Sequence, residues 1–234
     1  MEGETEGCVQ LLLDAMEKAN MLSDLNNALG GGRDKVIEMG GRNEAIQRVL
    51  DKAFMLEFKY KEVKTAAEEG NEARLRALLE TSEKAGVTEE VLKATDRDGM
   101  TLLLLASNKG HQACLRTLLD ASEKAGLTKE ALRDGRALMA ASKAGQEACL
   151  RTLLDASEKA GITEEALKAT DEGGMTALML ASARGHEACL RALLEASEAA
   201  CATVLALKAT NMYGSTALLA LEAMDEQVLK ATNE

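Results

Sequence analysis

Proline is absent from this chain of 234 residues, tryptophan is absent as well, and the aromatic residues are limited to two phenylalanines and two tyrosines. Average usage near 5% would place about a dozen prolines in a chain of this length, so the residue that most often breaks helices is missing. Aromatic and β-branched aliphatic residues, which favour strands, are few, whereas Ala, Leu, Glu and Lys are frequent. This composition argues against a β-rich domain and predicts an all-α fold.

The sequence also lacks long apolar runs. No segment approaches the ~18 consecutive apolar residues that span a bilayer. The acidic start, MEGETEG, differs from the basic start of a secretory signal. We therefore expect a soluble, intracellular protein of the cytoplasm, with no membrane partner.

Clusters of basic residues are lacking, and the formal net charge is −11. Nucleic acid is excluded as a partner because its phosphates require a basic surface. The acidity is typical of a solvated helical surface, with binding to a basic partner as the alternative. The five cysteines are odd in number and most fall within predicted helices, so we expect reduced, buried thiols.

The sequence contains a conspicuous internal repeat. The segment ACLRTLLDASEKAG at residues 113–126 recurs letter for letter at residues 148–161, and looser copies begin at Ala73 and Ala188. Repetition at this period indicates one supersecondary unit that is stacked several times, each unit burying its apolar face against its neighbours. Such an array offers an extended surface, for which binding is the default function.

Each unit is expected to contain a turn, two helices and a third, short helix. In the copy TDEGGMT, Asp171 and Gly174 suit a reversal of the chain, and the Thr176 hydroxyl caps the apolar helix ALMLASA that follows. A second, amphipathic helix begins after Gly185. In the preceding copy, Thr163 is expected to cap the short helix EEALKA.

These phrases resemble ankyrin repeats, whose pattern is D-x-x-G-x-T-P-L-H-x-A-x-x-G-H-x-x-x-V-x-x-L-L. Residues 96–122 and 171–197 keep its Asp, Gly, Thr, Leu, Ala, Gly and His at the family's spacing, and NMYGSTALLAL from Asn211 matches its first half. The family's proline and first histidine are replaced, and one turn is shortened to RDGR at residues 133–136. The resemblance implies an ankyrin-like α-solenoid of stacked helix pairs with short turns, here with an extra short helix in each repeat.

We divide the chain into a degenerate N-terminal helical or capping region, residues 1–58, and ankyrin-like repeats over residues 59–234. The expected repeats span about residues 59–98, 99–134, 135–173 and 174–213, with a partial repeat at residues 214–234. Phe54 and Phe58 lie four residues apart, with Tyr60 nearby, and we favour a bulky plug for the stack over an exposed hot spot.

No residues are arranged for catalysis or for metal binding. His111 with Cys114, and His186 with Cys189, have the spacing of metal ligands on one helix face, but each pair supplies two ligands and is explained by packing. Both histidines are used in these pairs, so neither remains for a nucleophilic triad. We expect no enzyme, no cofactor and no metal; an enzyme with its site at residues 20–65 has no motif behind it.

The resemblance implies a monomeric, non-catalytic module for protein–protein interaction or scaffolding, which binds its partner on the concave face of turn tips and first helices. The alternative is a structural or designed solenoid with no natural partner, which the missing prolines and near-identical duplications would fit. Mapped residue by residue, the expected binding residues are Arg97, Asp98, Met100, Asn108, Lys109, Glu172, Met175, Arg184, Met212, Tyr213 and Ser215.

Overall fold

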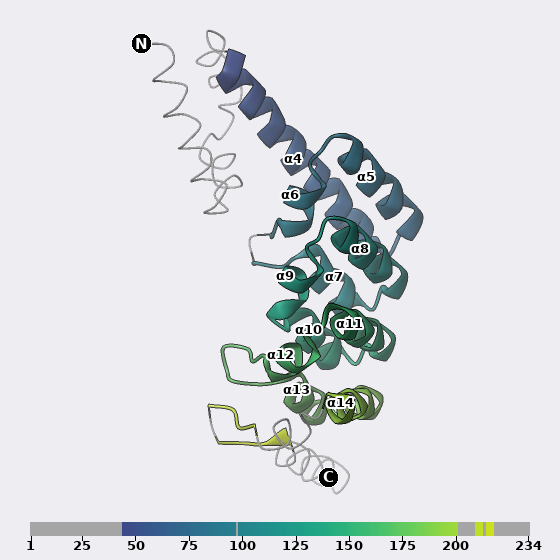
Figure 1. Ribbon diagram of the computed structural model, residues 1–234, viewed down its shortest axis with the longest axis vertical. Coiled ribbons are helices and arrows are strands. Elements are labelled where there is room, and N and C mark those ends of the chain that lie inside the picture. Colours follow the sequence, from purple (N-terminus) through teal and green to yellow (C-terminus); the bar gives the residue numbers. More distant parts are fainter. Residues whose placement is uncertain (1–43, 97, 201–208, 213, 218–234) are drawn as a thin grey trace, which may run out of the picture.

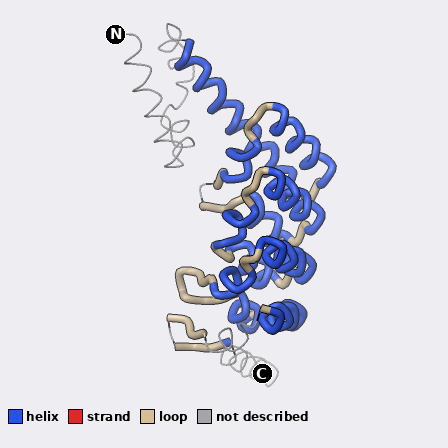
Figure 2. Tube along the Cα trace, in the orientation of Figure 1, coloured by secondary structure: helices blue, strands red, loops and turns tan. Residues whose placement is uncertain are grey.

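The computed structural model describes residues 44–96, 98–200, 209–212 and 214–217. These residues form eleven helices joined by turns and loops, and the described part of the chain contains no strand (Figure 2). The all-α prediction is therefore confirmed. One isolated bridge pairs Thr95 with Thr101.

The helices form three columns along the long axis of the molecule (Figure 1). The inner column consists of α4 (Glu44–Glu69), α7 (Leu102–Lys109), α10 (Arg136–Ala144) and α13 (Ala177–Ala183). The outer column consists of α5 (Glu72–Lys84), α8 (Gln112–Lys124), α11 (Glu147–Ala160) and α14 (Glu187–Ala199). The third column contains the short helices α6 (Thr88–Lys93), α9 (Thr128–Arg133) and α12 (Thr163–Lys168). The first three units thus have the expected helix pair followed by a short helix, and the residues that follow α14, 201–208, lie outside the described part of the chain.

Three of the inner helices, α7, α10 and α13, are short, and capping residues define the start of α7 and α13 and the end of α7. The Thr101 hydroxyl accepts a hydrogen bond from Leu104 N, and the Thr176 hydroxyl accepts one from Met179 N, as expected from the sequence. Gly110 ends α7 in the left-handed conformation. Between these caps, every residue of α7 from 102 to 107 is buried, because the helix packs between α4 and α10 of its own column and against α8 of the outer column.

The short helices begin differently from the sequence expectation, and the prediction that Thr163 caps α12 was wrong. Thr163 is the first helical residue, and the preceding Ile162 occupies the cap position without a side-chain hydrogen bond. Ile162 is buried, so an apolar side chain held in the core positions the start of this helix. The equivalent hydroxyls of Thr88 and Thr128 are buried and have no hydrogen-bond partner in the described part of the chain.

The outer helices are amphipathic and bury one face against the inner column. Repeated serines on this face donate hydrogen bonds to the carbonyl four residues earlier, which satisfies each buried hydroxyl within its own helix. Cys114, Cys149 and Cys189 are buried free thiols at one repeated position, and burial raises the pKa of each thiol. The expected buried, reduced thiols are confirmed for these three; Cys8 and Cys201 lie outside the described residues.

Helix α4 occupies the inner position of the first unit, and its N-terminal turns extend beyond the stack (Figure 1). The expected plug is wrong for Phe58, whose side chain is 62% exposed. Tyr60 packs against the core instead. The side chain of Phe54 lies outside the described residues. The expected domain boundary between residues 58 and 59 falls inside α4, and the division into domains stays a prediction.

Candidate binding face at the turns and inner helices

Three turns project from the inner column on the side of the short helices (Figure 1), at residues 95–101, 170–176 and 210–216. In the first two, an aspartate side chain accepts two backbone N–H groups. Asp96 Oδ1 accepts from Asp98 N at 3.0 Å and from Met100 N at 2.9 Å. Asp171 Oδ1 accepts from Gly173 N and Met175 N in the same way. The sequence therefore identified the residues that shape these turns.

The first turn is held against α4 by two side chains. Lys64 Nζ lies 2.9 Å from Asp96 Oδ2, and the Tyr60 hydroxyl donates to the Met100 carbonyl at 3.4 Å. Burial alone would raise the pKa of Asp96, but Lys64 and the two backbone N–H groups outweigh it and lower this pKa below its ordinary value. The hydrogen bond to Asp96 raises the pKa of Lys64. Burial raises the pKa of Tyr60.

The second and third turns contact each other directly. Met212 N donates a hydrogen bond to the Gly173 carbonyl at 3.2 Å, and Asn211 Nδ2 lies 3.2 Å from Met175 Sδ. The approach is close, since a Cβ on Gly174 would lie 3.1 Å from Met212 N. The two turns therefore form one continuous edge.

The unit between the first and second turns has no projecting turn, and only Asp134 and Gly135 connect α9 to α10. Gly135 has a φ of +63°, and a Cβ there would lie 2.4 Å from Ala169 Cβ, so a side chain would clash with the residue that ends α12. Arg136 extends toward the first turn, where Nη2 donates to the Gly99 carbonyl at 2.9 Å. The sequence predicted this shortening but not the bridging arginine.

The expected binding residues divide into exposed, half-buried and undescribed groups. Five charged or polar ones are exposed, and Met212 is 66% exposed. Met100, Met175 and Ser215 are half-buried, and the two methionines pack against the core, so they support the turns more than they present surface. Arg97 and Tyr213 lie outside the described residues. The five exposed residues of the first group are Asp98, Asn108, Lys109, Glu172 and Arg184.

Charge is separated across this face. Lys109, Lys143 and Arg184 lie exposed at the C-terminal ends of three inner helices, and within the described residues none of them is in an ion pair. Asp98 and Glu172 lie exposed at the turns, beyond the opposite ends of these helices. Lys143 was missed from the sequence, although aligning ALMAASKA with LLLLASNK places it opposite Asn108.

The two histidines pack between units. His111 Nε2 donates to the Glu68 carbonyl at 3.0 Å, and His186 Nε2 donates to the Lys143 carbonyl at 3.3 Å. Each ring lies against a glycine of the preceding unit, at Gly70 and Gly145. Among the described residues, no three His, Cys, Asp or Glu side chains are placed to hold a metal ion.

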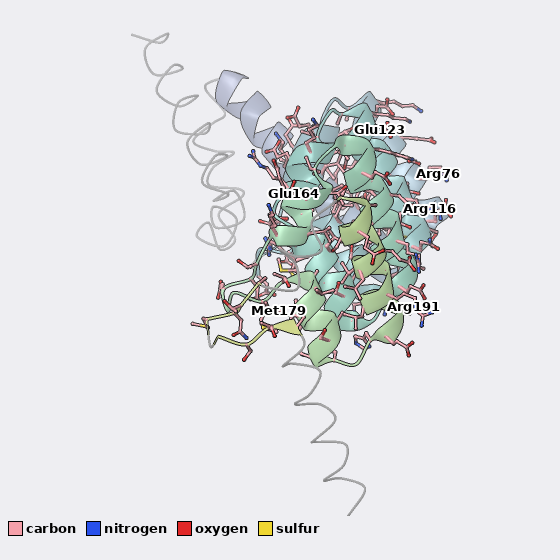
Figure 3. The ribbon with its side chains drawn as sticks, turned by 60° about the horizontal axis from the view of Figure 1, so that its bottom comes forward. Arg76, Arg116, Glu123, Glu164, Met179 and Arg191 are labelled. Atoms are coloured by element: carbon pink, nitrogen blue, oxygen red, sulfur yellow. The ribbon has the colours of Figure 1, made fainter. Side chains whose placement is uncertain are left out.

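The outer helices present a different surface. Figure 3 shows Arg76, Arg116 and Arg191 pointing away from the stack along this side. Arg76 and Arg191 form ion pairs within their own helices, each at 2.6 Å from a glutamate. Grooves of about 560 Å³ and 300 Å³ separate α8 from α11 and α11 from α14, and their linings mix alanines with charges of both signs. Exposed ion pairs such as those of Arg76 and Arg191 contribute little to stability.

In the described part of the chain, no helix is both long enough and apolar enough to span a membrane. A family model described as ankyrin repeats (3 copies) matches residues 63–165 and 138–226, which together cover more than half of the chain. No curated protein matches the sequence. The stacked helix pairs, the aspartate-stabilised turns and this match establish the family of the protein: the chain belongs to the ankyrin repeat family.

Proposed function

We propose that this chain is a non-catalytic module that binds a protein partner, or holds a scaffold together, through its turns and inner helices. Ankyrin repeats generally mediate protein–protein interactions and are typically non-catalytic. We call the proposed surface the turn face and define it by seven exposed residues: Asp98, Asn108, Lys109, Lys143, Glu172, Arg184 and Met212.

The observation that carries the proposal is the charge separation on the turn face. The carboxylates of Asp98 and Glu172 lie at the turns, and the cations at the far ends of the inner helices form no ion pair with any residue that the structure describes. A partner with basic groups over the turns and acidic groups over Lys109, Lys143 and Arg184 would be complementary in charge. The outer helices lack this separation, because most of their arginines pair with glutamates of the same surface.

Met212 adds an apolar contact to the turn face. Its side chain is 66% exposed at the tip of the third turn, next to the Glu172 turn that it touches through its backbone. An exposed methionine contributes adaptable apolar surface, which partner-binding faces often use. A partner would therefore gain apolar burial at the turns and ion pairs at the inner-helix ends.

The test uses a partner that the wild-type chain captures from lysate and that is then identified and purified. Titration calorimetry compares wild type with the double variant Lys109→Glu/Arg184→Glu, which reverses both cations on the turn face. We expect its Kd to rise by at least about tenfold. The matched control is Arg116→Glu/Arg191→Glu on the outer helices, for which we expect a change below about twofold.

Two results would count against the proposal. Loss of binding in the outer-helix control, with the turn-face variant unaffected, would place the partner on the opposite surface. Failure of the wild-type chain to capture anything above a scrambled-repeat control would favour the structural solenoid with no natural partner.

A further inference from the structure

The connection between α9 and α10 lacks the projecting turn found in the neighbouring units. On each side of it, a backbone N–H or C=O group has no hydrogen-bond partner among the described residues. Where consecutive turns are present, the second residue of one turn donates its N–H to the carbonyl of the third residue of the preceding turn, as Met212 does to Gly173. The equivalent groups beside the shortened unit are the Asp98 carbonyl and the Glu172 N–H. Among the described residues neither group has a hydrogen-bond partner. The ladder of turns is interrupted at this unit.

A pocket of about 190 Å³ lies beside the interruption. Thr101 and Arg136, which follow the first turn and the shortened connection, are part of its lining. Leu92, Leu104 and Ala131 supply apolar surface, and Leu92 is half-buried although the equivalent Leu132 and Leu167 of the other short helices are buried. Sites for small-molecule ligands usually hold ~300 Å³ or more. The pocket therefore suits one aliphatic side chain.

The charged residues around the pocket already have hydrogen-bond or ion-pair partners. Lys93 Nζ lies 3.3 Å from Glu130 Oε2, Arg136 donates to the Gly99 carbonyl, and Asp134 Oδ1 accepts from Arg136 N. A charged side chain entering the pocket would lose its hydration against a partly apolar lining, whereas an aliphatic side chain would bury apolar surface.

We propose that this place takes a reverse turn of a partner protein, which substitutes for the missing turn of the array. A backbone N–H of the partner donates to the Asp98 carbonyl, a backbone carbonyl of the partner accepts from the Glu172 N–H, and a Leu or Met side chain of the partner enters the pocket. A helix is a poor occupant because its N–H and C=O groups already bond to each other. The inference rests on the proposed function and names the kind of segment that the turn face recognises.

The experiment uses a phage-displayed library of disulfide-closed loops, as long as the chain's own turns and fully randomised, selected on the full chain. We expect the selected loops to carry Leu or Met at one fixed position. In heteronuclear NMR spectra they should shift the Glu172 amide and the methyl groups of Leu92 and Ala131, and leave the outer-helix signals unchanged.

Two variants decide whether the loops use this place. Ala131→Leu fills the pocket, and we expect the Kd of the loops to rise by at least about tenfold. Its control is Ala156→Leu, a half-buried alanine that lines the groove between α8 and α11, for which we expect less than about twofold. In the second variant, the sequence of residues 171–175 replaces Asp134 and Gly135, which restores a turn, and it should abolish loop binding. Unchanged melting temperatures show that each variant is folded.

The inference is overturned if no loop is selected above background, or if selected loops bind Ala131→Leu or the turn-restored variant as tightly as wild type. Suppose that either of these results is found while Lys109→Glu/Arg184→Glu still loses the captured partner. The turn face then remains the binding surface, and the partner contacts a part of it other than the pocket and the shortened connection. Self-association of the chain that Ala131→Leu removes would also overturn it, because the occupant would then be a second copy.

Discussion

Gly145 and Gly161 belong to the same unit. Comparing an alanine variant at each position separates the energy of packing between units from the cost of backbone strain. Gly145 ends α10 with a φ of +70°, and Gly161 ends α11 with a φ of +67°. A Cβ at Gly161 would meet no atom within 4 Å. A Cβ at Gly145 would lie 2.8 Å from Cε1 and Nδ1 of His186 and 3.1 Å from its Cγ. Gly145→Ala and Gly161→Ala therefore differ mainly in the clash with His186.

The expected magnitudes follow from this geometry. An alanine in the left-handed conformation costs about 1 kcal/mol of unfolding free energy, and this cost is common to both variants. At Gly145 the new methyl group also displaces the His186 ring and removes its hydrogen bond to the Lys143 carbonyl, worth about 1 kcal/mol. The total for Gly145→Ala, with the lost packing of the ring, is about 2–3 kcal/mol. Reduced entropy of the unfolded chain affects both variants alike and cancels in the comparison.

The assay is equilibrium urea unfolding followed by circular dichroism, with the double-mutant cycle completed by His186→Ala. In the His186→Ala background, Gly145→Ala should cost about as much as Gly161→Ala does in wild type, ~1 kcal/mol, because the clash is gone. Equal destabilisation by the two glycine variants in wild type, or no coupling between residues 145 and 186, would refute the argument that the histidine positions successive units.

Three further predictions concern the first turn, the thiols and the third turn. The pKa of Asp96 is lowered in the fold, so its contribution to stability is present above its ordinary value of 3.8 and is lost as the pH falls through the lower, folded value. The pKa of Lys64 is raised, so its contribution is present below 10.5 and is lost as the pH rises through the folded value. The protection factor of the Met100 amide, which is the ratio of its intrinsic exchange rate at each pH to its observed rate, should therefore be largest between these limits and fall toward either one. Cys149→Val should cost less than about 1.5 kcal/mol in urea unfolding because the site is small and apolar, and native Cys149 should react slowly with thiol reagents; stoichiometric zinc in the purified protein would contradict this packing role. Tyr213→Ala should weaken partner binding by at least about 1 kcal/mol in calorimetry while the melting temperature stays unchanged, and full binding by this variant would show that the partner makes no important contact with the tyrosine.

Local signals in the sequence were sufficient for the unit itself. Thr101 and Thr176 cap their helices, Asp96 and Asp171 organise their turns, and Gly161 ends α11, because each of these interactions joins residues at most four positions apart. The shortened connection after α9 was predictable for the same reason, because it involves only residues that are adjacent in the sequence. Exposure along α4 was less predictable, since the helical spacing of Phe54 and Phe58 says that they share a face but not what covers it.

The sequence by itself determined that the chain is a stack of ankyrin repeats, that an extra short helix follows the helix pair in the units where the structure describes it, and which residues form the turns. Only the tertiary structure decided how the units meet. The bond from Arg136 to Gly99 and the bond from His186 to Lys143 join residues 37 and 43 positions apart. The pocket beside the missing turn is lined mainly by the short helices α6 and α9 and the inner helices α7 and α10. Such contacts depend on the rise and rotation from one unit to the next, which arise from the packing of whole helices and have no signature within a single repeat.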